Sequence, residues 1–374
     1  MKYRLVDLLI CPFCRHPLAL SKCFEYSQLA ENHSKIGYNE IEEGVLTCNN
    51  CGRCYPIIKG VPRILPDALM KNILFRDYLY FVKKHKNYLP KDFGRATENA
   101  DIVGLKKKTL EVFGYEWQTF SEMYDVYKEQ FLDWIYPIKK DFFKNKLILD
   151  AGCGLGRHVY YAAEFGAEVI GVDLSRAVDL AYKNTMHKSN VHIVQADIYY
   201  LPFRERMFDF IYSIGVLHHL PDPEAGFKTL LKFLKTDRTI FAWVYGKEGN
   251  NLLRLLKPLR ANLTTKMSLR DLKILSYFIT AFLLPVLRIY KLLNEKAITK
   301  QLAERLPQNA FFYYLSKFSF RQNHSIIFDQ LVAPIANYYT KEEFKRWFDN
   351  ASLKNVSIVW RNRNSWKGFG TKVE

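Results

Sequence analysis

The residues best placed to do chemistry lie around position 150. An apolar run at residues 147–149 ends in Asp150, and Gly152, Gly154 and Gly156 follow before a helical pattern begins. Glycines let a ligand approach the backbone closely, so we predict a strand, a binding turn and a helix. The spacing is G-x-G-x-G, not the G-x-G-x-x-G of dinucleotide sites, and Asp150 would repel a diphosphate. S-adenosylmethionine, which carries an ammonium and a sulfonium, suits this acid better.

Two further acids end apolar runs at residues 168–173 and 191–197. Asp173 lies 23 positions after Asp150, about the offset at which a nucleotide-site acid binds ribose hydroxyls. Asp197 is placed to accept a hydrogen bond from an adenine amino group. The predicted cofactor-binding residues are Asp150, Gly152, Gly154, Gly156, Asp173, Leu174, Asp197, Ile198, Ser213 and Gly215.

A fourth apolar run, residues 208–214, leads into a loop that contains His218 and His219. This loop is expected to face the methyl group of bound S-adenosylmethionine. Histidine is the usual general base near neutral pH, so both are candidate catalytic residues. The alternative is that one caps a helix and the other packs in the core.

The order of these elements, with a fifth strand at residues 239–245 and two more at 356–360 and 368–371, predicts an α/β fold. The motifs Asp-x-Gly-x-Gly-x-Gly, Val-Asp-x-Ser, Ala-Asp and Leu-His-His-Leu resemble those of one branch of the class I S-adenosylmethionine-dependent methyltransferases. The resemblance covers residues 145–250 and 336–374. It implies a seven-stranded Rossmann-like sheet of order 3-2-1-4-5-7-6, and methyl transfer as the activity.

Acceptor contacts are predicted in two aromatic clusters. Tyr115 and Trp117 belong to a helical linker that could cover the donor site, and Tyr338 and Tyr339 precede a capping box at residues 340–343. Plain packing is the alternative for both clusters. No Asn/Asp-Pro-Pro-aromatic motif and no Pro-Cys pair follows the fourth strand, so hydroxyl, carboxyl or activated-carbon acceptors remain.

Cysteines near the N-terminus have the spacing of a metal site. The pairs Cys11/Cys14 and Cys48/Cys51 are two C-x-x-C motifs, which suit tetrahedral zinc. Cys54 makes a third such pair with Cys51 and is an alternative ligand, and a disulfide framework is a further alternative. Residues 1–66 resemble the Trm112-type zinc ribbon, which implies structural zinc, because four thiolates leave no open position on the metal.

The chain has 374 residues and a net charge of +17. We predict a ribbon at 1–66, a helical linker or lid at 67–145, and a methyltransferase domain at 146–374 with a helical insertion at 251–335. Residues 251–374 hold 21 Lys and Arg against 8 Asp and Glu. This basic excess indicates an anionic partner, namely a membrane surface, a nucleic acid or a phosphorylated substrate; an ordinary soluble surface is the alternative.

Residues 272–293 predict a long helix with a wide apolar face. Its most apolar part, residues 275–287, is shorter than the about 20 residues of a membrane span, so we expect an interfacial helix, a lid, or internal packing.

The leading hypothesis is methyl transfer to an oxygen or carbon of a small acceptor, with lipid-linked and saccharide acceptors as candidates. A cytoplasmic protein is expected, and a peripheral position at a membrane surface is left open. An RNA methyltransferase and a non-catalytic donor-binding scaffold are the alternatives, and the oligomeric state stays open.

Overall fold

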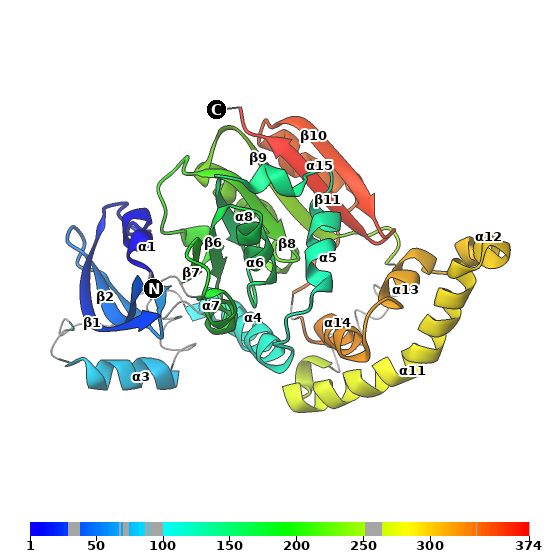
Figure 1. The fold of residues 1–374 in the computed structure, drawn as a ribbon, viewed down its shortest axis with the longest axis horizontal. Coiled ribbons are helices and arrows are strands. Elements are labelled where there is room, and N and C mark those ends of the chain that lie inside the picture. The colour runs from blue at the N-terminus through cyan, green and yellow to red at the C-terminus, as the bar shows by residue number, and fades with distance from the viewer. Residues whose placement is uncertain are drawn as a thin grey trace.

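The computed structural model describes residues 1–28, 38–66, 69, 75–86, 89, 100–250, 264–333 and 335–373. Its centre is an 11-stranded sheet of order β1-β2-β3-β4-β7-β6-β5-β8-β9-β11-β10 (Figure 1). Its methyltransferase strands are β5 (Leu147–Ala151), β6 (Glu168–Asp173), β7 (Val191–Ala196), β8 (Phe208–Ile214), β9 (Leu234–Tyr245), β10 (Lys354–Arg361) and β11 (Ser365–Thr371). The order from β7 to β10 confirms the predicted 3-2-1-4-5-7-6, with β11 antiparallel to both neighbours.

Helices cover both faces of this sheet, which is why its central strands are apolar on both sides. One face packs against α5 (Val126–Ile135), α6 (Arg157–Glu164) and α7 (Ala177–Thr185). The other packs against α8 (Pro223–Phe233) and α15 (Lys341–Asn350). The predicted capping box opens α15, because the Thr340 hydroxyl accepts from the Glu343 amide at 3.1 Å and the Glu343 carboxylate accepts from the Thr340 amide at 2.8 Å.

The N-terminal ribbon consists of α1 (Tyr3–Leu8), β1 (Leu18–Gln28), β2 (Tyr38–Cys48), β3 (Cys54–Ile58) and β4 (Val61–Ile64). The whole sheet has more strands than the seven predicted for the methyltransferase domain, because the ribbon strands join it. Strand β4 runs parallel to β7, with Arg63 opposite Gln195 and Ile64 opposite Ala196. An edge strand presents unpaired backbone groups, and the ribbon uses those of β7, so the two parts share one continuous sheet.

The predicted linker, residues 67–145, contains α3 (Phe75–Lys84), α4 (Ala100–Thr119) and α5. The insertion contains α11 (Leu269–Glu295), α12 (Ala297–Arg305), α13 (Asn309–Leu315) and α14 (Phe320–Val332), while residues 251–263 and 334 of its predicted range lie outside the described residues. In Figure 1, α14 lies beside α4, and α11 runs along the outer side of α14 to α12 at the edge of the molecule.

Helix α11 is longer than the predicted 272–293. The Ser268 hydroxyl caps it by accepting from the Asp271 amide at 3.1 Å, and Pro285 lies inside without ending it. By length and composition, α11 is the one helix of the described ranges able to cross a membrane. The length of α11 therefore does not support the prediction that its apolar part is too short to cross a membrane.

Candidate active site

A cavity of about 300 Å³ lies at the carboxyl ends of the parallel strands, at the low end of small-molecule sites. Its floor consists of residues that directly follow β5, β6, β7 and β8, because the ends of parallel strands meet at one edge of the sheet. The predicted cofactor residues that line it are Gly152, Gly154, Asp173, Leu174, Asp197, Ile198 and Gly215.

The glycine turn after β5 brings bare backbone to the cavity. Gly152 and Gly154 have φ of +93° and +53°. A Cβ on Gly152 would lie 2.2 Å from a methyl of Val216, and one on Gly154 would lie 3.2 Å from the indole of Trp117. A side chain at Gly154 would therefore fill the space between the turn and the cap above it.

The acids after β6 and β7 are held by backbone amides. Asp173 accepts hydrogen bonds from the Gly154 amide at 2.9 Å and from the Ser175 amide and hydroxyl at 2.8 and 2.7 Å. Burial raises the pKa of Asp173, and these hydrogen bonds oppose the rise. Asp197 accepts from the Tyr199 amide at 3.0 Å. Both carboxylates are thereby fixed in place at the cavity wall.

Three predicted cofactor residues lie behind the wall rather than in it. Gly156 precedes α6, and a Cβ there would contact Ala181 at 3.1 Å. The Ser213 hydroxyl donates to the Ala151 carbonyl at 2.8 Å. Asp150 still belongs to β5 and is fully buried, so burial raises its pKa well above the ordinary value. Neither Asp150 oxygen has a hydrogen-bond partner among the described residues.

The two histidines occupy different environments. His219 lines the cavity, and its Nδ1–H donates to the Ile335 carbonyl at 2.5 Å. A carbonyl can only accept, so the lone pair of the neutral ring is on Nε2. His218 is fully buried, with its ring centroid 4.1 Å from that of Tyr245. Burial, followed by nearby His219, lowers the His218 pKa well below its ordinary value.

One face of α4 covers the cavity. Phe113, Glu116, Trp117 and Phe120, spaced i, i+3, i+4 and i+7, all line it. Tyr115 instead packs against Phe328, with ring centroids 6.0 Å apart.

The other two predicted tyrosines also lie in different environments. Tyr338 lines the cavity and stacks on Tyr245 at 5.6 Å. Tyr339 does not line it, and packs on Trp347 at 4.9 Å. Tyr339 is therefore placed among core residues, one position away from the cavity wall.

Several polar cavity residues were missed or left unassigned in the sequence. The Tyr245 hydroxyl donates to Asp329 at 2.9 Å and accepts from the Gln330 amide at 2.8 Å. Glu116 is buried and its Oε2 has no hydrogen-bond partner among the described residues. Burial, followed by Asp329, raises the Glu116 pKa well above its ordinary value. The helical spacing around Glu116 was a usable signal, whereas no local pattern joins Asp329 to this site.

Arg157 is the cation beside the glycine turn. Its guanidinium lies over the rings of Trp117, Tyr127 and Trp134 at 5.6, 5.2 and 5.4 Å. Such cation–π contacts are typical of arginine. They hold a positive charge at the wall of the cavity that Asp173 and Asp197 also line.

The four predicted zinc ligands come together in the ribbon. The Sγ atoms of Cys11, Cys14, Cys48 and Cys51 lie within 4.8 Å of one another. Tetrahedral zinc with Zn–S bonds of about 2.3 Å needs sulfurs about 3.8 Å apart, so this set fits the ion. Cys54 lies outside the cluster, where its Sγ contacts the Thr47 hydroxyl and the Gly52 carbonyl at 3.5 Å.

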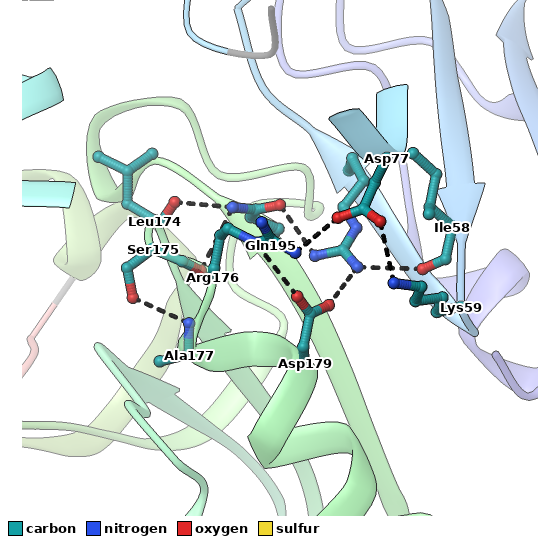
Figure 2. Close-up of polar contacts among 10 residues, drawn as sticks. Ile58, Lys59, Asp77, Leu174, Ser175, Arg176, Ala177, Asp179 and Gln195 are labelled. Carbon is teal, nitrogen blue, oxygen red and sulfur yellow. Dashed lines mark hydrogen bonds and ion pairs between the residues drawn. The ribbon is translucent and has the colours of Figure 1, made fainter. Parts of the chain in front are cut away.

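The ribbon is also linked to the segment after β6, which begins with Leu174 and Ser175 (Figure 2). Arg63, 1% exposed, donates to Gln195 at 3.0 Å and to the Ile58 carbonyl at 3.0 Å, and forms an ion pair with Asp179. Gln195 in turn donates to the carbonyls of Leu174 and Ser175 at 2.9 and 3.2 Å. Since Leu174 and Ser175 line the cavity, two side chains link the ribbon to its wall.

Part of this chain is similar to known proteins. Caenorhabditis elegans phosphoethanolamine N-methyltransferase 2 is 32% identical over 111 residues, 29% of this chain and 25% of that protein. The tRNA U34 carboxymethyltransferase of Nautilia profundicola is 35% identical over 95 residues, 25% of this chain and 30% of that protein. Arabidopsis thaliana tocopherol O-methyltransferase is 38% identical over 96 residues, 24% of this chain and 27% of that protein.

These alignments span about a quarter to a third of the length of the curated relatives. Two family models match separate parts of the chain. Residues 2–60 match the family described as Trm112p-like protein, and residues 149–242 match that described as methyltransferase domain. The chain therefore contains a Trm112p-like domain at its N-terminus, joined through a shared sheet to a domain of the methyltransferase family.

Proposed function

We propose that this protein transfers a methyl group from S-adenosylmethionine to an oxygen or carbon of a small acceptor. One observation carries the proposal: the glycine turn after β5 and the acids after β6 and β7 line the same cavity. The methyltransferase-domain match over residues 149–242 supports it independently.

The charges around the cavity fit this donor. Asp173 is the residue we assign to the ribose hydroxyls and Asp197 to the adenine amino group. Asp329 lines the same cavity and is the further acid that we assign to the sulfonium and ammonium groups, and Arg157 is the cation that we assign to the donor's carboxylate. The buried Glu116 oxygen without a partner is a group that such a ligand would satisfy.

When bound, S-adenosylmethionine supplies an already activated methyl group. The protein therefore has to align the acceptor, exclude water and remove a proton where the acceptor carries one. We assign proton removal to Nε2 of His219, because its Nδ1 proton is held by the Ile335 carbonyl. The Tyr245 hydroxyl, held between Asp329 and Gln330, would orient the acceptor.

A small acceptor is favoured because α4 and the helical insertion cover the cavity. Aromatic side chains of α4 and of the insertion close over it, including Phe113, Phe120 and Phe318. A polynucleotide enzyme would need an open basic groove with rings for stacking bases. The tRNA-modifying relative keeps RNA as the alternative to be tested.

The test is to incubate the full chain with cell extract and methyl-labelled donor, and to separate lipid, RNA, protein and small-molecule fractions. We expect label in the small-molecule or lipid fraction, and none with the Asp173→Ala variant. Label in RNA would overturn the acceptor class. Absence of label from every fraction, with donor binding intact, would favour a non-catalytic scaffold.

A further inference from the structure

The outer face of α11 is apolar, whereas its inner face is partly polar. Ser276 and Thr280 are fully buried on the inner side, where His324 of α14 lies 2.8 Å from the Ser276 hydroxyl. Large apolar side chains point outward instead, and Phe282 is 82% exposed. We define the α11 outer face by its exposed residues Ile274, Phe278, Phe282, Val286, Ile289 and Leu292. Only 22% of the most apolar 18-residue window of α11 is buried.

The next helix, α12 (Ala297–Arg305), also exposes apolar side chains. In α12, Ile298 is 96% exposed and Leu302 is also exposed. Monomeric soluble proteins rarely expose contiguous apolar surface on this scale without a partner. The surface therefore points to an occupant with apolar character.

Cations flank the α11 outer face on one side. Arg270 and Arg288 are 18 residues apart, as are Lys273 and Lys291. Because 18 residues make five helical turns, each pair shares one angle around the helix. Residues 264–305 hold eight Lys and Arg against three Asp and Glu. An apolar face beside a row of cations complements a surface of anionic headgroups over acyl chains.

We propose that the α11 outer face binds the surface of an anionic lipid bilayer, with α11 lying in the interface plane. A membrane span is disfavoured because α14 packs along α11, so spanning would carry α14 into the hydrocarbon. A second copy of the chain is disfavoured because it would bring two sets of these cations together.

Helices α13 and α14 lie between α11 and the cavity. Helices α13 and α14 pack on α11, and their residues Leu315, Ile326 and Asp329 line the cavity. Docking would therefore place the helical cap of the cavity at the membrane surface. The inference goes beyond the proposed methyl transfer and does not depend on it, because lipid binding needs neither donor nor turnover.

The test is flotation of the full chain with vesicles of phosphatidylcholine, with and without phosphatidylglycerol. We expect binding to the anionic vesicles only, weakening as salt is added. Phe282→Glu should lower the partition coefficient at least tenfold, since a buried Phe contributes about 1.5–3 kcal/mol. The double variant Arg288→Gln/Lys291→Gln should lower it about 30-fold, at about 1 kcal/mol for each cation.

Leu79→Glu is the matched control, because Leu79 is an exposed apolar residue on α3, which Figure 1 shows on the opposite side of the molecule. It should bind like the wild type, and all variants should keep wild-type donor affinity by calorimetry. The proposal is overturned if the wild type ignores anionic vesicles or if Phe282→Glu binds them equally well. It is also overturned if bound protein resists carbonate extraction as a spanning protein does, or if Phe282→Glu only converts a dimer to a monomer.

Discussion

At His219, one backbone contact decides which ring nitrogen can act as a base. The Ile335 carbonyl accepts a hydrogen bond from Nδ1–H, so Nε2 carries the lone pair. Its neighbour His218 lies in the same sequence motif but is fully buried and does not line the cavity. The two residues therefore have separate expected phenotypes.

His219→Gln should lower kcat by about 10²–10⁴-fold, the usual contribution of a general base, if the acceptor carries a proton to be removed. Donor affinity should stay within about twofold of the wild type, because donor binding is assigned to other residues. Steady-state kinetics and calorimetry on one preparation measure both. Unchanged kcat would return His219 to a packing role.

Buried histidines should make stability depend on pH. Burial holds the pKa of His158 and His218 well below 6.5 in the folded protein. Below pH 6.5 the unfolded chain takes up protons that the folded chain does not. The free energy of unfolding should therefore fall with decreasing pH, by about 1.4 kcal/mol per pH unit for each histidine.

In denaturant titrations between about pH 5 and 6, His218→Phe should make the free energy of unfolding depend less steeply on pH, by about 1.4 kcal/mol per pH unit. A slope in His218→Phe equal to that of the wild type would contradict this account.

Residue types and spacing predicted the acids and glycines because their function depends on positions at strand ends. Asp150 shows the limit of this reasoning. It is one residue short of the end of β5, and so lies under the turn and not in the cavity. Asp329 and Tyr245 meet only through the fold, and a sequence without its tertiary contacts contains no signal for that meeting.

At the scale of elements, the ribbon stabilises the methyltransferase sheet as well as itself. Strand β4 occupies the edge of β7, and Arg63 connects it to Gln195 and Asp179. Apolar runs, each of which is local, located the seven strands, and the resemblance to the methyltransferase family implied their order. The sequence did not predict the β4–β7 pairing, because nothing in either strand alone specifies an edge partner.

Arg63→Met should lower the free energy of unfolding by about 2 kcal/mol, because it leaves buried hydrogen-bond acceptors without a charged donor. It should also weaken donor binding, since Gln195 holds the Leu174 and Ser175 carbonyls. Lys59→Met is the matched control. Lys59 is an exposed cation of the same network, paired with Asp77, and should cost less than about 1 kcal/mol. Equal losses in chemical denaturation would refute a special role for Arg63.

Cys14→Ser should release zinc and lower the thermal stability of the ribbon, because three thiolates and a hydroxyl bind zinc poorly. Cys54→Ser should keep one zinc per chain, since Cys54 lies outside the sulfur cluster. Metal analysis together with thermal unfolding distinguishes them. Stoichiometric zinc in Cys14→Ser, or its loss in Cys54→Ser, would show that the ligand set is wrong.

At the scale of the whole molecule, three separate segments build one chamber. The sheet provides the floor, α4 provides one side of the cap, and the insertion provides the other. The acids, the glycine turn and Arg157 together give this chamber charges that complement a cationic ligand with an adenosine group. Donor binding in this chamber is the premise of the proposed activity.

The most direct test is calorimetric titration of S-adenosylmethionine into the full chain and its Asp173→Ala variant, with the exposed Asp141→Ala as control. We predict saturable one-to-one binding by the wild type and by Asp141→Ala. Affinity should be at least tenfold weaker in Asp173→Ala, because charge-assisted hydrogen bonds contribute about 1.5–3 kcal/mol. No binding by the wild type, or equal affinity in Asp173→Ala, would contradict the donor site described above.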